Sequence, residues 1–230
     1  MRLLALDTST EFLSLALQDG EQLYLHHAHA GQSHSQTILP TIRGLLNEAG
    51  LDIHDLNGVV FGAGPGSFTG LRIGCGVAQG LAFGASLPAI GIGTLLAMAE
   101  ASGHSRVVAC LDARMGEVYH AAYIKHETGW QEVLPPTVCK PELVTMVEGA
   151  DWHGVGNAWG VYGDVLQALH GERLVGVMPD LYPEASAMLN LAAPMLAAGL
   201  GQPAEEAAPV YVRNRVALKT QEREAGLKLN

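Results

Sequence analysis

Cysteine, aromatic residues and positive charge are all scarce in this sequence of 230 residues. Its three cysteines include no C-x-x-C pair, which excludes a disulfide-stapled scaffold and a zinc knuckle. Aromatic residues make up only 6%, whereas 28 glycines are present, so we expect close backbone packing to replace large rings in the core. Acids outnumber bases by 23 to 13, and the resulting net charge of −10 disfavours a stand-alone nucleic-acid binder.

Long apolar runs are also missing. Glycine, glutamine or a charge interrupts every apolar stretch well before the roughly eighteen residues that a membrane span needs. The first acid, Asp7, comes too early for the apolar core of a signal peptide. We therefore predict a reduced, cytoplasmic protein that has no contact with a membrane.

Positive charge is concentrated near the end of the chain. Five of the thirteen bases lie there: Arg213, Arg215, Lys219, Arg223 and Lys228. Glu222 and Glu224 dilute this run, so a solvated tail is the favoured interpretation. A contact with RNA or with a protein partner is the alternative.

Apolar periodicity predicts an α/β protein. The first hundred residues read as three strands, a helix, a strand, a helix, a strand and a helix, at 3–7, 12–17, 22–27, 33–49, 58–62, 68–84, 87–92 and 94–101. Ser33 and Gln36 have the spacing of a capping box at the start of the first helix. In the second half we expect strands at 107–112, 117–124 and 132–138, a strand end at 154–157, and helices at 141–148 and 184–198.

Two points of the second half echo the first. Leu111-Asp112 ends an apolar strand as Leu6-Asp7 does, and the small residues of 154–157 resemble those of 61–64. We therefore expect a duplicated unit, each copy having a mixed sheet with helices on its faces. The predicted domains are 1–103 and 104–230.

Two loops have positions that suit a phosphate. The turn Asp7-Thr8-Ser9-Thr10 occupies the place of a phosphate-binding hairpin, but it lacks glycine, so hydroxyl capping of the turn is an equal alternative. The segment 64–70, G-P-G-S-F-T-G, leads from a strand into a helix. Its Gly64, Gly66 and Ser67 either hold an anion at the positive helix end or form a tight turn. It matches neither a P-loop nor G-x-S-x-G, so we assign no nucleophile.

The helix after this loop carries five glycines: Gly70, Gly74, Gly76, Gly80 and Gly84. Each glycine destabilises a helix by about 1 kcal/mol relative to alanine, so we expect these five positions to have a packing role that requires glycine. Such a stripe lets another helix approach closely, and a second protein chain is favoured over a helix of the same chain. The first helix adds an apolar stripe at three- and four-residue spacing. The predicted partner interface comprises Ile38, Ile42, Leu45, Leu46, Gly70, Gly74, Val77, Gly80, Leu81 and Gly84.

Metal ligands are not evident. Four of the ten histidines cluster, at His26, His27, His29 and His34. They lack the H-x-x-x-H spacing of a helical metal site, so surface histidines and no metal are predicted. Asp112, Arg114 and Glu117 follow another strand and predict an ion-pair lock, with a partner contact as the alternative.

Four segments are specific in combination: 4–10 (LALDTST), 34–40 (HSQTILP), 64–74 (GPGSFTGLRIG) and 112–119 (DARMGEVY). With PVYVRN at 209–214, they resemble the bacterial TsaB family, also called YeaZ. The resemblance runs over nearly the whole chain and is weak over about 125–205.

The resemblance implies two actin/Hsp70-like (ASKHA, RNase H-like) domains, the second reduced. It also implies a non-catalytic subunit in making N6-threonylcarbamoyladenosine at position 37, just after the anticodon, of tRNAs that read ANN codons. The implied partners are a TsaD-like sister subunit, which holds the transferase site, and a TsaE-like ATPase, with tRNA bound only through the complex. No cofactor is firmly implied, although weak ATP or ADP binding at the complex fits. Self-association is expected to compete with the sister subunit, because a bundle of paired helices is self-complementary.

Two other classes remain as alternatives. An ATP-binding kinase-like enzyme of the same superfamily would need a glycine in the hairpin at 7–10. A peptidase, an older label of the family, would need a nucleophile or a ligand set that this sequence does not show. The sister family binds its metal through H-x-x-x-H, and the matching stretch here, 90–97, has no histidine.

Overall fold

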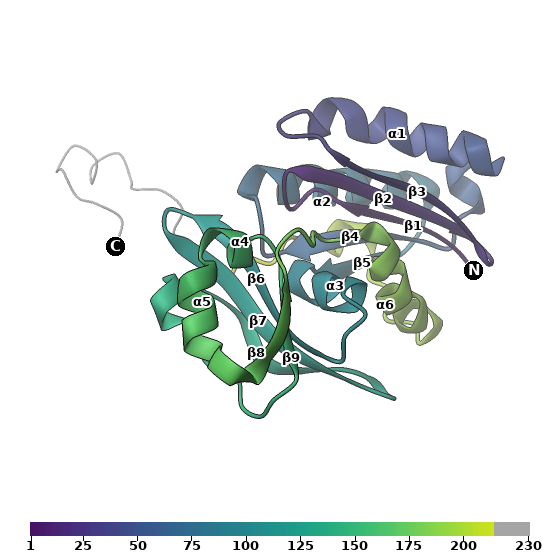
Figure 1. Cartoon of the computed structure of the whole chain (residues 1–230). Coiled ribbons are helices and arrows are strands. Elements are labelled where there is room, and N and C mark those ends of the chain that lie inside the picture. Colours follow the sequence, from purple (N-terminus) through teal and green to yellow (C-terminus); the bar gives the residue numbers. More distant parts are fainter. Residues whose placement is uncertain (214–230) are drawn as a thin grey trace, which may run out of the picture.

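The computed structural model describes residues 1–213, and the tail bases Arg215, Lys219, Arg223 and Lys228 lie outside the described residues. Its first half builds a five-stranded sheet in the order β3-β2-β1-β4-β5 (Figure 1). The strands are β1 (Arg2–Asp7), β2 (Phe12–Asp19), β3 (Gln22–His29), β4 (Gly58–Gly64) and β5 (Ala89–Gly93). The first three form an antiparallel meander, and β4 and β5 continue the sheet in parallel with β1.

The second sheet repeats this topology in the order β10-β9-β6-β7-β8. Its strands are β6 (Arg106–Arg114), β7 (Glu117–His126), β8 (Gly129–Cys139), β9 (Trp152–Val155) and β10 (Leu174–Met178). An antiparallel meander of β6, β7 and β8 is again followed by two parallel strands beside the first. The repeat confirms the α/β class with two actin/Hsp70-like units, and it gives β1 and β6 the same central position.

Helices cover both faces of the first sheet. On one face lie α1 (His34–Ala49) and α2 (Phe68–Ala85), and on the other lie α3 (Thr94–Ala101) and α6 (Ala185–Ala197). The second sheet is covered on one face by the short helices α4 (Ala158–Val161) and α5 (Gly163–His170) (Figure 1). Within residues 1–213, no helix is both long and apolar enough to cross a bilayer.

The helix α3 is a layer shared by the two sheets. Ala97 packs with the core of the first sheet, whereas Leu95, Met98 and Ala99 pack with the core of the second. All four side chains are fully buried. A rotation of one sheet against the other would therefore have to open a packed core, which holds the two units in one arrangement.

The predicted division at residue 103 requires a correction, because the chain returns to the first unit. The apolar face of α6, with Met188 and Leu189, completes the core on the open face of the first sheet. The Ala185 N–H donates to Ser14 Oγ on β2 at 2.9 Å, and Gln202 pairs with Ala89 at the edge of β5. The first unit thus includes residues from both ends of the described chain.

Local predictions failed at a few points. The expected helix at 141–148 is only a single turn, Pro141–Leu143, because Val144 and Val147 bury their branched side chains from an irregular segment. Ser33 does not cap α1, since its hydroxyl donates to the Ala30 carbonyl at 2.7 Å. The short elements α5 and β10 were not predicted.

Glu100 on α3 joins elements of both units. Its Oε2 accepts hydrogen bonds from Lys125 Nζ on β7 and from Trp130 Nε1 on β8, both at 2.7 Å. Its Oε1 accepts from Asn190 Nδ2 on α6 at 3.4 Å. Burial acts to raise the pKa of Glu100, but these hydrogen bonds and the charge of Lys125 outweigh it, so the pKa lies below its ordinary value.

We predict that Glu100→Gln lowers the free energy of unfolding by about 1 kcal/mol at neutral pH. A lowered pKa stabilises the fold above the ordinary glutamate pKa, and this contribution is lost as the pH falls through the folded value. Urea unfolding at pH 7 and below pH 4 measures the free energy of unfolding of both proteins. The difference between wild type and variant should disappear in acid. A gap that stays constant with pH would show that the charge of Glu100 contributes nothing.

Candidate functional site

The glycine-rich loop after β4 packs directly against the turn after β1. Ser67 N donates to the Ser9 carbonyl oxygen at 2.7 Å, and Thr8 Oγ1 donates to the Gly70 carbonyl oxygen at 2.7 Å. A Cβ at Gly66 would lie 2.5 Å from the Ser9 carbonyl oxygen, and one at Gly70 would overlap that of Thr8. Only glycine allows this approach, so these residues build the turn.

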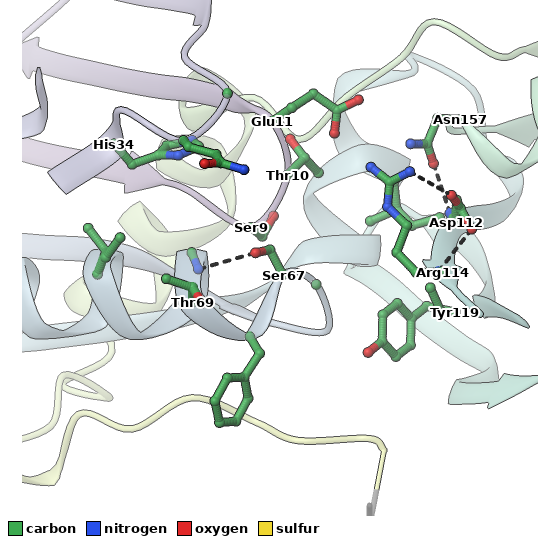
Figure 2. A pocket seen from close by; sticks show the side chains of 18 of the residues that line it. Ser9, Thr10, Glu11, His34, Ser67, Thr69, Asp112, Arg114, Tyr119 and Asn157 are labelled. Atoms are coloured by element: carbon green, nitrogen blue, oxygen red, sulfur yellow. Dashed lines mark hydrogen bonds and ion pairs between the residues drawn. The ribbon is translucent and has the colours of Figure 1, made fainter. Parts of the chain in front are cut away.

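Two backbone donors at the start of α2, the N–H groups of Ser67 and Gly70, are engaged within the chain. Ser67 caps the helix, because its Oγ accepts from the Gly70 N–H at 3.2 Å (Figure 2). The Ser67 N–H is bonded to Ser9, as described above. Gly64 has a φ of +110°, and a Cβ there would lie 2.8 Å from the Val210 carbonyl oxygen, which explains its identity without a ligand. The geometry supports the tight-turn alternative, and anion binding here stays a prediction.

Asp7 ends β1 and is completely enclosed. Its Oδ1 accepts from the Ser9 N–H at 2.9 Å and the Ser9 hydroxyl at 2.7 Å, while its Oδ2 has no partner among the described residues. Burial raises the pKa of Asp7 to about 6, although the bonds from Ser9 act in the opposite direction. Gly62 on β4 leaves space for this carboxyl, since a Cβ there would overlap Oδ2.

A cleft of about 830 Å³ lies between the two units, in front of this turn. Thr10, Glu11 and His34 line one side, and Arg114, Tyr119 and Asn157 line the other (Figure 2). Ser9 and Ser67 also line it, whereas Asp7 and Thr8 do not. The sequence did not identify the cleft, because its two sides come from segments about a hundred residues apart.

The predicted lock of Asp112, Arg114 and Glu117 is only half correct. Arg114 pairs with Asp112 at 3.3 Å, but its side chain is 76% exposed, so the pair contributes little to stability. Glu117 instead pairs with Arg213, whose guanidinium also donates to the Ala113 carbonyl at 3.1 Å. Arg213 was predicted to belong to a solvated tail, and the structure places it in the wall of the cleft.

The histidine cluster is split between surface and interior. His29 is exposed, and His27 stacks on Phe12 with ring centroids 4.9 Å apart. His34 is buried and its Nε2 lies 3.1 Å from the Phe12 carbonyl oxygen, so the prediction of a surface position is wrong for this residue. Among residues 1–213, no three His, Cys, Asp or Glu side chains are placed to hold a metal together.

Half of the predicted partner interface is buried inside the chain. Ile38, Ile42 and Leu45 form the inner face of α1 and are at most 6% exposed, because the apolar stripe of α1 covers the sheet. Gly74 lies against Thr8, where a Cβ would be 2.5 Å from Oγ1, and Gly70 packs as described above. These five residues therefore serve the fold and do not reach a partner.

The outer face of α2 remains open. A Cβ at Gly76, Gly80 or Gly84 would meet no atom within 4 Å. Phe83 on the same face is 71% exposed, and no pattern in the sequence singles it out. The other predicted residues, Leu46, Val77 and Leu81, are half-buried against the core. The glycines of α2 thus divide into an inner set that meets Thr8 and an outer set that meets nothing.

Comparison with known proteins identifies the family to which this architecture belongs. A family model described as TsaD, tRNA N6-adenosine threonylcarbamoyltransferase, matches residues 26–220. TsaB of Escherichia coli K12, named as a tRNA threonylcarbamoyladenosine biosynthesis protein, is 42% identical over 95% of this chain and 97% of that protein. The chain belongs to the TsaB family.

Other relatives agree in sequence and in structure. TsaB of Haemophilus influenzae is 38% identical over 95% of this chain and 96% of its own length. The solved structure of YeaZ from Pseudomonas aeruginosa is 39% identical, with a TM-score of 0.83, and covers 91% of this chain and 99% of that one. The near-complete coverage means that the fold of both units matches that of the solved YeaZ structure.

The two sets of glycines predict opposite responses to alanine. Gly70→Ala should lower the free energy of unfolding by about 1–3 kcal/mol, because its Cβ collides with the Thr8 carbonyl. Gly80→Ala should raise it by about 1 kcal/mol, because alanine is the better helix former and space is open. Urea unfolding of both variants measures the difference, and equal effects would contradict the division.

Asp7→Asn should change how stability depends on pH. A pKa raised from 3.8 to about 6 means that the wild type loses up to about 3 kcal/mol as the pH rises through this range, because the buried carboxyl must ionise. The amide can still accept from Ser9 but cannot ionise. Urea unfolding at pH 4.5 and 7.5 should therefore show that the variant becomes more stable relative to wild type as the pH rises. The same pH dependence of the free energy of unfolding in both proteins would contradict a raised pKa of Asp7.

Proposed function

We propose that this chain is an accessory, non-catalytic subunit in the formation of N6-threonylcarbamoyladenosine at position 37 of tRNAs that read ANN codons. The observation that carries the proposal is the nearly end-to-end match to TsaB proteins named for tRNA threonylcarbamoyladenosine biosynthesis. The chain acts by binding and supporting a TsaD-like sister subunit, which holds the transferase site.

The outer face of α2 is the surface that fits this partner. Gly76, Gly80 and Gly84 offer a strip of backbone without side chains, on which another helix can lie closely. Phe83 and, on the neighbouring helix α1, Leu39 are 71% and 51% exposed. Exposed apolar side chains beside a contact strip are typical of protein–protein interfaces.

A non-catalytic role is supported by the contacts that the glycine-rich loop makes within the chain. Ser67, the residue that a peptidase reading would choose, uses its hydroxyl to cap α2. The kinase-like alternative would need a glycine in the hairpin at 7–10, and none is present there. Gly66 and Gly70 pack closely onto the carbonyls of Ser9 and Thr8, and this approach of the two loops accounts for both glycines without a bound phosphate.

Several further features of the assembly follow from the same proposal. The face on α2 is self-complementary, so pairing of two copies competes with pairing to the sister subunit. A TsaE-like ATPase joins the complex, tRNA binds only through it, and ATP or ADP binds weakly where a partner completes the cleft. The complex works in the cytoplasm and needs no metal in this subunit.

The test is Gly80→Leu, which places a branched side chain on the contact strip. We expect a folded protein whose association with the sister subunit weakens by about tenfold or more in gel filtration and calorimetry, because overpacking costs about 1–3 kcal/mol. Modified adenosine in a reconstituted mixture should fall accordingly. Ala168→Leu, at an exposed position of α5, is the matched control. Normal association of Gly80→Leu would overturn the proposed surface.

A further inference from the structure

Three side chains stack at the N-terminal end of the outer face of α2. The Arg72 guanidinium carbon lies 3.8 Å from the centroid of the Phe68 ring, and Arg72 Nε donates to the Tyr211 hydroxyl at 3.0 Å. The rings of Phe68 and Tyr211 are 5.7 Å apart. Phe68 is 39% and Tyr211 47% exposed, so this is an ordered cluster of large side chains on the surface.

The chain around Tyr211 is held at both ends. Val210 N donates to the Ala63 carbonyl at the end of β4 at 2.7 Å. Arg213 is bonded to Ala113 and Glu117 in the second unit. Tyr211 therefore has a defined position, and it fixes the guanidinium of Arg72 from one side while Phe68 covers it from the other. A side chain held in this way loses little further entropy on binding a partner.

The guanidinium still has donors to offer. Among residues 1–213, only the Tyr211 hydroxyl accepts from Arg72, through Nε, and no carboxylate pairs with it. The two terminal nitrogens form the planar fork that binds a carboxylate with two parallel hydrogen bonds. Arginine next to aromatic rings is also the composition typical of binding hot spots.

This cluster continues the proposed contact strip. Arg72, Gly76 and Gly80 follow one another at four-residue steps along α2, and all three are exposed. Residues at this spacing lie on one face of a helix. A helix that lies along the glycines therefore brings its own side chains past Arg72 at the end of the strip.

We infer that Arg72, held in place by Phe68 and Tyr211, is an anchor that binds a carboxylate side chain of the sister subunit. The inference rests on the proposed function, because it assumes that this face of α2 meets that subunit. Arg72 makes the contact, and Tyr211 is a positioning residue that acts through it. A single carboxylate suits this site better than RNA, because a polyanion would also meet the net charge of −10 that the chain carries.

The experiment measures the dissociation constant of the full-length chain and the sister subunit at low and high salt. Arg72→Gln and Arg72→Lys should both weaken binding by about tenfold, because neither presents the planar fork. Tyr211→Phe keeps the ring but removes the acceptor, so it should weaken binding less and reduce its salt dependence. Lys140→Gln, at an exposed position of the second unit, is the matched control.

The results distinguish a failure of the Arg72 anchor from a failure of the proposed partner surface on α2. If Gly80→Leu weakens binding and the Arg72 variants do not, the anchor is refuted and the surface stands. If none of them weakens binding, the surface fails as well. If Arg72→Gln leaves the dissociation constant unchanged but lowers tRNA binding by the assembled complex, Arg72 binds a phosphate and the carboxylate inference is overturned.

Discussion

Gly66, just before α2, and Gly70, in the first turn of α2, lie against the carbonyl oxygens of Ser9 and Thr8, and this contact is possible only where the chain has no side chains. Gly66, Gly70 and Gly74 provide that approach, and the remainder of the site follows from it. The contact holds the glycine-rich loop after β4 against the turn after β1. It also sets the rotation of α2 on the sheet, so that the other glycines point outward.

Two further features, helix α3 and the segment around Tyr211, connect the two units near this contact. The shared helix α3 fills the space between the sheets, so the two walls of the cleft cannot separate without exposing core residues. The segment around Tyr211 then passes from the end of β4 to the hairpin that carries Glu117. The protein is thus built as a rigid support, which fits a subunit that acts by binding another.

Much of the fold could be predicted from sequence, because its elements have clear periods of two and 3.6 residues. The order of the elements, together with the echo between Leu6-Asp7 and Leu111-Asp112, predicted the duplication that both sheets show. The partner face was predicted less well, since a glycine beside Thr8 and a glycine in open space look the same in a sequence. The stripe of Ile38, Ile42 and Leu45 fits a helix on a sheet as well as a helix on a partner, and only burial separates the two. The role of Arg213 could not be found, because its acceptors lie about a hundred residues away.

The central claim is that α2 uses its inner glycines for the fold and its outer glycines for the partner. The most direct test is the alkylation rate of a thiol introduced by Gly80→Cys, measured with and without the sister subunit. The half-buried Cys139 in the second unit serves as the internal reference, and Cys75 and Cys110 are buried. We expect the introduced thiol to react at least about tenfold more slowly in the mixture, while the rate at Cys139 is unaffected. An unchanged rate at the introduced thiol, in a mixture shown to be associated, would contradict it.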